Sequence, residues 1–297
     1  TRSHGTHVSG TVGSPNENIG VAPAVKLIGL QVFPPEGTTS YTPIEDALQW
    51  VIDNRSTYNI TSVNMSLGGG FYTSREEASG VPIIDEIREL ERLGVTVVSS
   101  AGNSYKERQS PNVGAPAIFS TLAVGAVWQD GDSLGRFTDD QIAGSDRITV
   151  FSQRLNAPNI IFAPGAMINS TVPNGGYDRW PGTSMASPHV AGAVALMQEA
   201  AQQFGGRTLA PSEIVEIMRS TAVAVFDGDD ENDVVTNTNT SYPRLNIYNA
   251  ISEIQRRFSN QGGGNPDNNG TLTGAILGPT LDGSPVGALS GSIGTDG

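Results

Sequence analysis

The chain has 297 residues, of which 37% are hydrophobic, so it can bury the core of one large domain or two smaller ones. Its 17 lysine and arginine residues stand against 30 aspartate and glutamate residues, and the net charge of -13 argues against binding to nucleic acid or to an anionic membrane surface. The absence of cysteine excludes disulfides, thiolate metal sites and a thiol nucleophile. No apolar run is long enough to predict a membrane span.

Short apolar runs alternate along the chain with segments of helical periodicity. Such runs are typical of buried parallel strands, and the alternation predicts an α/β fold with helices on both faces of a mostly parallel sheet. Functional groups are then expected just after the carboxyl ends of the strands. The predicted strands are 25–33, 62–67, 95–100, 121–127 and 160–163, and the predicted helices lie within 44–51, 83–94, 184–202 and 211–222.

The composition changes sharply near the C-terminus. Residues 1–258 carry the α/β pattern, whereas 259–271 is rich in glycine and predicts a flexible linker. Residues 272–297 contain short apolar pieces about an Asp282-Gly283 turn, and they fit either a disordered tail or the start of a β-rich accessory domain.

Two of the three histidines, His4 and His7, stand close together near the start of the chain. They could form a metal pair, or one of them could act as a catalytic base. The zinc interpretation is weak, because a H-E-x-x-H site needs a spacing of four and an intervening glutamate. We therefore favour a catalytic base.

Ser184 lies where a turn is expected to become a helix. A serine at that position presents a hydroxyl nucleophile together with a free backbone N–H that can bind an anion. The alternative is a simple helix N-cap. The segment is not the G-x-S-x-G elbow of α/β-hydrolases, because residue 186 is alanine, and Pro188 lacks the N–H that would bond to the Ser184 carbonyl.

Asn103 follows the apolar strand 95–100. It is either an ordinary turn residue or a side-chain donor to an oxyanion. The glycines of 64–70 (NMSLGGG) would let an extended peptide approach the backbone closely.

Taken in order, the motifs HGTHVSGT, NMSLGG, AGN and GTSMASPHVAGA resemble those of the subtilisin-like serine peptidases, the subtilases, over about residues 3–255. The resemblance implies a three-layer αβα fold. It makes His4 the general base and Ser184 the nucleophile that forms an acyl-enzyme, with Asn103 and the Ser184 amide as the oxyanion hole. His7 and His189 would then be structural.

The resemblance also implies that two edge segments sandwich an extended protein or peptide substrate. The wall of the pocket for P1, the residue on the acyl side of the scissile bond, would be built from small residues that leave room for a large apolar side chain. Pro116 matches a proline that often follows a cis bond in this family. The implied substrate-binding residues are Ser66, Leu67, Gly68, Gly37, Thr38, Thr39, Ala101, Gly102, Gly114 and Ala115.

The chain departs from the family pattern at its start. It begins with Thr1 rather than Met, and the triad aspartate of subtilases lies on the first core strand, a few tens of residues before the histidine. We therefore expect a fragment or processed chain that lacks this strand and aspartate and is nearly inactive by itself, cut from an active parent. A second departure is 136–156, which resembles an insertion and is expected to be a surface loop or a distal substrate contact.

Two rival functions stay open. The first is a catalytically inactive subtilase-fold module that retains the peptide groove, and the second is a sedolisin-type carboxyl peptidase. The second is disfavoured because His4 and Asn103 stand where that group uses carboxylates.

The resemblance requires no cofactor for the chemistry and no metal at the catalytic residues, but it allows structural calcium. One candidate is the loop 16–21, and the other is the acidic run Asp227, Asp229, Asp230, Glu231 and Asp233, which lacks the EF-hand pattern and is otherwise a solvated loop. The resemblance further implies a propeptide in the parent, a monomer, and a secreted or cell-surface location in a bacterium.

Overall fold

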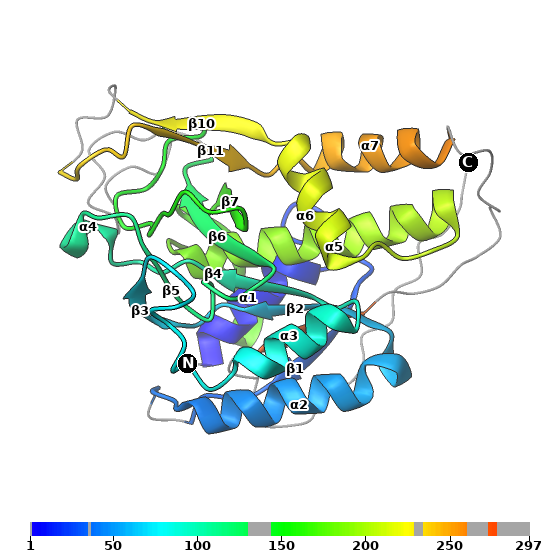
Figure 1. Cartoon of the computed structure of the whole chain (residues 1–297). Helices are drawn as coiled ribbons and strands as arrows, with labels where there is room; N and C mark the ends of the chain where they lie inside the picture. The colour runs from blue at the N-terminus through cyan, green and yellow to red at the C-terminus, as the bar shows by residue number, and fades with distance from the viewer. Residues whose placement is uncertain (1, 35–36, 130–143, 229–233, 260–272, 278–297) are drawn as a thin grey trace.

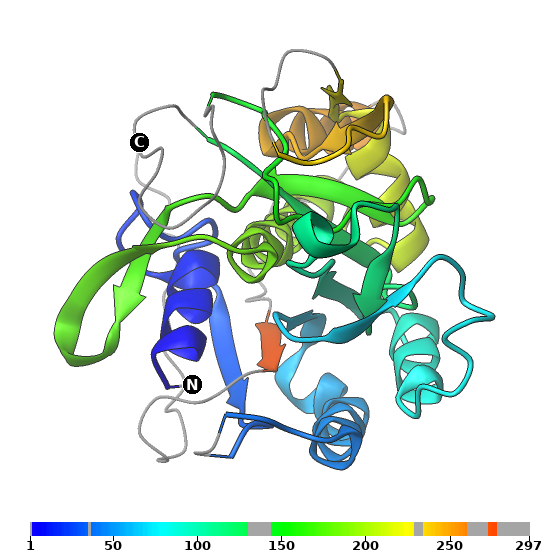
Figure 2. The same cartoon turned by 90° about the vertical axis from the view of Figure 1, so that its left-hand side faces the viewer.

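The computed structural model describes residues 2–34, 37–129, 144–228, 234–259 and 273–277. A central sheet lies between two layers of helices (Figures 1 and 2). This is the expected three-layer α/β fold. The helices are α1 (Arg2–Gly13), α2 (Tyr41–Tyr58), α3 (Ile84–Arg92), α4 (Tyr105–Arg108), α5 (Thr183–Gly205), α6 (Pro211–Ser220) and α7 (Ile247–Ser259), with a short 3-10 turn at Pro173–Gly175.

Eight strands form the main sheet, in the order β1-β12-β2-β4-β6-β7-β11-β10. All neighbours are parallel except β10 and β11, which form an antiparallel pair at one edge. Two small antiparallel pairs, β3 with β5 and β8 with β9, lie outside this sheet. The strands are β1 (Lys26–Leu30), β2 (Ile60–Met65), β3 (Gly69–Tyr72), β4 (Thr96–Ser100), β5 (Val113–Ala115), β6 (Leu122–Val127), β7 (Ile160–Pro164), β8 (Ile168–Val172), β9 (Gly176–Trp180), β10 (Val223–Asp227), β11 (Thr240–Arg244) and β12 (Thr273–Leu277).

Successive residues of the central strands point to opposite faces of the sheet, which creates two separate cores. In β4, Val97 belongs to the core that includes residues of α2 and α3, whereas Val98 belongs to the core that includes residues of α1, α5, α6 and α7. Both residues are fully buried, as expected for a sheet that helices cover on both faces. The same alternation occurs in β6, where Ala123 belongs to the first core and Val124 to the second.

The predicted elements all form. The five predicted strands correspond to β1, β2, β4, β6 and β7, and the four predicted helices to α2, α3, α5 and α6. Helix α5 runs through the second core, which explains why almost every side of its sequence is apolar or small.

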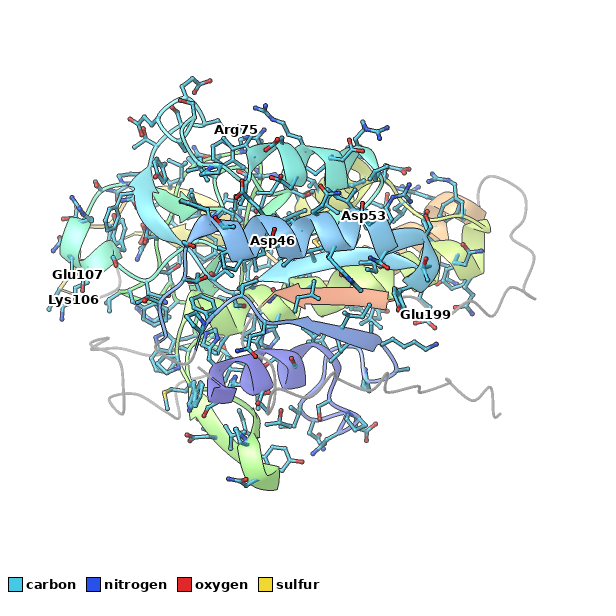
Figure 3. All side chains as sticks on the ribbon, turned by 90° about the horizontal axis from the view of Figure 1, so that it is seen from below. Asp46, Asp53, Arg75, Lys106, Glu107 and Glu199 are labelled. Atoms are coloured by element: carbon cyan, nitrogen blue, oxygen red, sulfur yellow. The ribbon has the colours of Figure 1, made fainter. Side chains whose placement is uncertain are left out.

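Residues 273–277 hold an unexpected position. The sequence places them in the tail beyond the linker, yet they form β12, which pairs in parallel with β1 on one side and β2 on the other (Figure 3). The predicted linker from residue 260 onward, together with 278–297 and its Asp282-Gly283 turn, lies outside the described residues. The proposed domain boundaries stay a prediction.

The expectation of a surface loop at 136–156 is wrong for residues 148–154, whereas the alternative of a distal substrate contact stays a prediction. Ile148, Val150, Ser152, Gln153 and Arg154 are all buried, at 0 to 3% exposure. This stretch is anchored by backbone hydrogen bonds to Gly102, Tyr105 and Asn112, so it belongs to the core next to β4 and β5. Residues 136–143 lie outside the described part of the chain.

Part of the acidic excess lies on outward-facing surfaces of the described residues. On α2, Asp46 and Asp53 are exposed on the face opposite the buried Ile44 and Leu48 (Figure 3). Within the described residues, none of the helices combines the length and the apolarity that a membrane crossing would require.

Candidate active site

Helix α1 places His4 at the edge of the sheet and is held there by the hairpin of β8 and β9. The Ser170 hydroxyl donates to the His7 carbonyl at 2.7 Å, and the Thr171 hydroxyl donates to the Thr6 carbonyl at 2.9 Å. Val8 on the same helix packs into the second core. The position of His4 is therefore fixed by contacts made one turn further along its helix.

His7 is a structural residue, as the family resemblance implies. Its Nε2 lies 2.9 Å from the Ile168 carbonyl and 3.1 Å from the Asp178 carbonyl, and because carbonyls only accept, Nε2 carries the proton. The ring stacks on Trp180 with a centroid distance of 4.9 Å. The zinc-pair interpretation is wrong, since His7 is buried against β8 and β9 and the described residues hold no cluster of three potential histidine or carboxylate ligands.

The amino terminus of α5 carries Ser184. The N-cap position belongs to Gly182, whose φ of 149° lies in a region that favours glycine, and Ser184 is the second residue of the helix. The alternative that Ser184 serves as the N-cap is therefore wrong. Its backbone N–H is one of the first-turn donors, which have no acceptor within the helix.

Pro188 lies inside α5 and leaves the Ser184 carbonyl without its helical donor, as the sequence indicates. The Ser66 hydroxyl takes that place and donates to the Ser184 carbonyl at 2.8 Å. Asn64 in turn donates to Ser66 Oγ at 3.0 Å and accepts from the Ser187 hydroxyl at 2.6 Å. These contacts join the end of β2 firmly to the first turn of α5.

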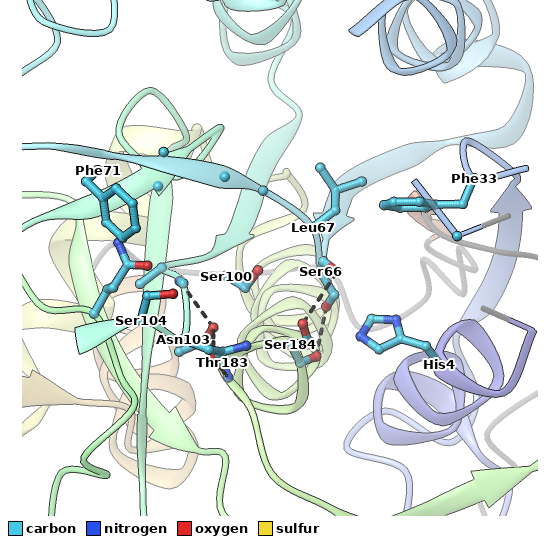
Figure 4. Close-up of a pocket in the computed structure, with 18 residues that line it drawn as sticks. His4, Phe33, Ser66, Leu67, Phe71, Ser100, Asn103, Ser104, Thr183 and Ser184 are labelled. Atoms are coloured by element: carbon cyan, nitrogen blue, oxygen red, sulfur yellow. Dashed lines mark hydrogen bonds between the residues drawn. The ribbon is translucent and has the colours of Figure 1, made fainter. Parts of the chain in front are cut away.

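Asn103 follows the end of β4 and is exposed. Its Oδ1 accepts two hydrogen bonds from Thr183, one from the backbone N–H and one from the hydroxyl, both at 2.8 Å. Because the oxygen is engaged at α5, the Nδ2 group is left as the outward-facing donor. Asn103 and the Ser184 amide thus present two N–H groups at one helix terminus (Figure 4).

His4 and Ser184 line the same cavity, which has a volume of about 600 Å³ (Figure 4). The Ser184 hydroxyl makes only a long contact of 3.5 Å to the Ser66 carbonyl, and within the described residues the His4 ring has no hydrogen bond. Burial lowers the pKa of His4 to about 4, and electrostatic repulsion from a protonated His7 acts in the same direction. The imidazole is therefore neutral near pH 7, the form that a general base needs.

All ten residues predicted to bind substrate line this cavity or an adjoining one of about 370 Å³. The first cavity takes in Ser66, Ala101, Gly102 and Gly114, the second takes in Thr38, Thr39 and Ala115, and both take in Gly37, Leu67 and Gly68. Sequence reasoning missed the cavity-lining residues Phe33, Phe71, Ser104, Tyr41 and Gln153.

The segment expected to form the pocket wall has the expected backbone. The Ala115-Pro116 peptide bond is cis, and β5 pairs with β3 so that Gly69 lies opposite Ala115. This pairing brings the glycine-rich segment after Ser66 alongside the wall.

Several oxygens of the two calcium candidates already have partners within the part of the chain that the structure describes. In the loop 16–21 the Asn16 carbonyl accepts from Ile19 and Gly20, and Asn16 Oδ1 accepts from Asn18, so these oxygens serve the loop itself. In the acidic run Asp227 is completely buried and bound to Arg154 and Thr238, and it is not a free ligand. Asp229, Asp230, Glu231 and Asp233 lie outside the described residues. Among the described residues, no group of three or more histidine or carboxylate side chains could hold a metal ion, and structural calcium stays a prediction.

Comparisons with known proteins identify the family of this chain. The sequence model of the Subtilase family matches residues 1–255. Subtilisin amylosacchariticus of Bacillus subtilis subsp. amylosacchariticus is 36% identical over 199 residues, which are 66% of this chain and 45% of that protein. The chain thus spans less than half of the length of that relative.

Solved structures share the fold. The patellamide maturation protease PatA superposes with a TM-score of 0.65 at 23% identity, over 85% of this chain and 84% of that one. A cold adapted subtilisin-like serine proteinase superposes with a TM-score of 0.57 at 30% identity, over 82% of this chain and 74% of that one. With the family model matching 255 of 297 residues, the chain belongs to the subtilase family.

Proposed function

We propose that this chain is the catalytic part of a serine endopeptidase that cleaves peptide bonds of proteins through an acyl-enzyme on Ser184. The observation that carries the proposal is the orientation of Asn103. Its oxygen is held by Thr183 at the terminus of α5, and its N–H₂ group is left free beside the Ser184 amide, in a cavity that His4 also lines. Two fixed donors beside a serine and a neutral imidazole suit acyl transfer.

In this proposal His4 takes the proton of the Ser184 hydroxyl as the oxygen attacks the substrate carbonyl. The carbonyl oxygen becomes negative and is bound by Asn103 Nδ2 and the Ser184 N–H. His4 then returns the proton to the leaving amine, and a water molecule hydrolyses the acyl-enzyme by the same route. The long contact from the Ser184 hydroxyl to Ser66 must give way to a contact with His4 during the reaction, as is common in unliganded sites.

The substrate is proposed to bind in extended form between two segments. The exposed backbone at Gly68 and Gly69 would pair with it on one side, and Gly37 to Thr39 on the other. The two adjoining cavities share Phe33, Gly37, Leu67, Gly68 and Gly69, so one peptide could run through both.

A second candidate is a peptide-binding module without catalysis. It is favoured by the His4 ring, which within the described residues donates no orienting hydrogen bond to a carboxylate. The prediction that an upstream aspartate supplies this contact stays a prediction, as do the propeptide, the monomeric state and secretion from a bacterium.

The test compares the chain with its Ser184→Ala variant, each also produced with the coding sequence that precedes it. Reaction with a fluorophosphonate reports an activated serine, and casein hydrolysis reports turnover. We expect both signals in the upstream-extended chain and neither in its Ser184→Ala variant. Equal casein hydrolysis by the two would refute the role of Ser184. Peptide binding without labelling in every form would favour the module.

A further inference from the structure

Gln153 is a buried amide on the wall of the larger cavity. The residue is 3% exposed, and its backbone N–H donates to the Gly102 carbonyl at 2.9 Å. Its side-chain oxygen lies directly against Gly102, because a Cβ at that position would overlap Gln153 Oε1. Gly102 immediately precedes Asn103, so this oxygen faces the space next to the candidate oxyanion hole.

The orientation of the Gln153 amide is fixed by a relay of hydrogen bonds. Asn112 Nδ2 donates to the Ser110 carbonyl at 2.6 Å, and since a carbonyl can only accept, Asn112 must turn its oxygen toward Gln153. Gln153 Nε2 then donates to Asn112 Oδ1 at 2.5 Å. The opposite end of the amide, Oε1, is left without a partner among the described residues.

Among the described residues that line the cavity beside this oxygen, none except His4 is ionisable. Glycines at 69, 70, 102 and 114 line it and contribute no side chains. Arg154, the neighbour of Gln153, is neutralised by Asp227 at 2.6 Å and points into the protein. A buried acceptor at the wall of such a cavity costs free energy when an occupant leaves it unpaired.

The side chain that occupies this space follows from the proposed function, on which this inference rests. A carbonyl held by Asn103 Nδ2 and the Ser184 N–H carries its own side chain one carbon away, so that side chain enters the glycine-lined space beside Gly102. We propose that Gln153 determines P1 specificity: its Oε1 accepts a hydrogen bond from a P1 side chain that ends in a neutral donor, such as a primary amide. The expectation of a large apolar P1 side chain is replaced by this preference.

The test uses three peptide p-nitroanilides, acetyl-Ala-Ala-Ala followed by Gln, Met or Glu. Gln and Met have similar lengths, but only Gln carries a donor, whereas Glu offers a second acceptor to Gln153 Oε1. We expect kcat/KM for the Gln substrate to exceed that for Met by about tenfold, and Glu to be the poorest. Calorimetry with the corresponding product peptides measures their affinities without turnover, and we expect the affinities to rank in the same order as the kcat/KM values.

Two variants test whether Gln153 causes the preference for the Gln substrate. Gln153→Met should lower the Gln-to-Met ratio to about one, while the matched control Gln203→Met, at an exposed position of α5, should keep it. Asn112→Leu removes the acceptor that holds Gln153 Nε2. The Gln153 amide can then turn its N–H₂ group toward a P1 glutamate, so kcat/KM for the Glu substrate should rise relative to that for Gln. The ratio of kcat/KM between two substrates is measured on one preparation of each variant. It is therefore independent of the fraction of that preparation that is folded.

The outcomes separate the two proposals. If the upstream-extended chain hydrolyses none of the peptides, the proposed function fails, and the product peptides still test Gln153 by binding. If peptides are hydrolysed or bound with a Gln-to-Met ratio that Gln153→Met leaves unchanged, the role of Gln153 is overturned.

Discussion

The side-chain oxygen of Asn103 accepts both the N–H and the hydroxyl of Thr183, each at 2.8 Å. The pair joins the end of β4 to the first residue of α5 across 80 positions of sequence. The contact determines which end of the asparagine amide faces the cavity. An asparagine that could rotate freely would offer its oxygen to a developing oxyanion as often as its N–H₂ group.

Substitutions at Asn103 and Thr183 should separate the effect of the orientation of the Asn103 amide on kcat from any effect on the stability of the protein. Asn103→Asp keeps the acceptor for Thr183 but removes the donor, so we expect kcat to fall about 10²–10³-fold, the loss measured for such an asparagine in subtilisin itself, with little change in Tm. Thr183→Val should cost less in kcat, because the Nδ2 donor stays and Asn103 Oδ1 loses the hydrogen bond from the hydroxyl but keeps the one from the backbone N–H of residue 183. The matched control Thr183→Ser retains the hydroxyl and should retain kcat. A large loss of kcat in Thr183→Ser would contradict this account.

The contact from the Ser66 hydroxyl to the Ser184 carbonyl predicts a coupling with Pro188. Ser66→Ala leaves that carbonyl unpaired and should lower the free energy of unfolding by about 1–3 kcal/mol. In a Pro188→Ala background the new backbone N–H of residue 188 can bond to the Ser184 carbonyl, so the cost of Ser66→Ala should shrink by about 1 kcal/mol. Urea unfolding of the four proteins completes the cycle, with the exposed Ser212→Ala as control. If the effects of the two substitutions on the free energy of unfolding are additive, the predicted coupling is contradicted.

The ion pair of Arg154 and Asp227 is completely buried, with an N–O distance of 2.6 Å. Asp227 also accepts from the backbone N–H of Thr238 at 2.9 Å, and the Arg154 guanidinium lies over the Tyr105 ring. Asp227→Asn leaves the buried guanidinium without a counter-charge and should destabilise the protein by about 3–5 kcal/mol.

The control for this prediction is the exposed pair of Arg92 and Glu89. Glu89→Gln should leave Tm unchanged, since solvent screens such pairs. A double variant, Arg154→Met with Asp227→Leu, should be more stable than Asp227→Asn alone, because it removes both buried charges. Equal Tm values for Asp227→Asn and the parent protein would contradict the prediction.

The histidines predict how stability depends on pH. Burial lowers the pKa of His189 to about 4 from its ordinary value of 6.5, although its Nδ1 donates to the Met185 carbonyl at 2.8 Å. Because the folded pKa lies below the unfolded one, the unfolded chain binds the proton first. The contribution to stability is therefore complete above pH 6.5 and is lost as the pH falls toward 4.

We expect His189→Gln to flatten this loss by an amount on the order of 3 kcal/mol between pH 6.5 and 4. Thermal unfolding of both proteins across that range measures it. Lowered pKa values of His4 and His7 predict that part of the loss persists in the variant. Parallel curves for the two proteins would show that His189 does not titrate in this way.

The sequence by itself determined five strands of the main sheet and four helices, and it singled out the candidate residues of the chemistry. Apolar runs such as 95–100 and 121–127 are long enough and apolar enough to be buried strands wherever they are placed, so β4 and β6 could be predicted from local pattern. Ser184 and Asn103 could be singled out because each stands at a boundary between elements, where backbone and side-chain donors are free.

Only the tertiary structure decided the contacts between distant segments. No local pattern indicates that Gln153, within an apparent insertion, lies against Gly102, or that Asp227 is bound to Arg154 rather than exposed in an acidic loop. The pairing of β12 between β1 and β2 likewise joins residues more than 200 positions apart. Such contacts depend on how whole elements pack, because the polarity of a residue does not reveal which partner will satisfy it when it is buried.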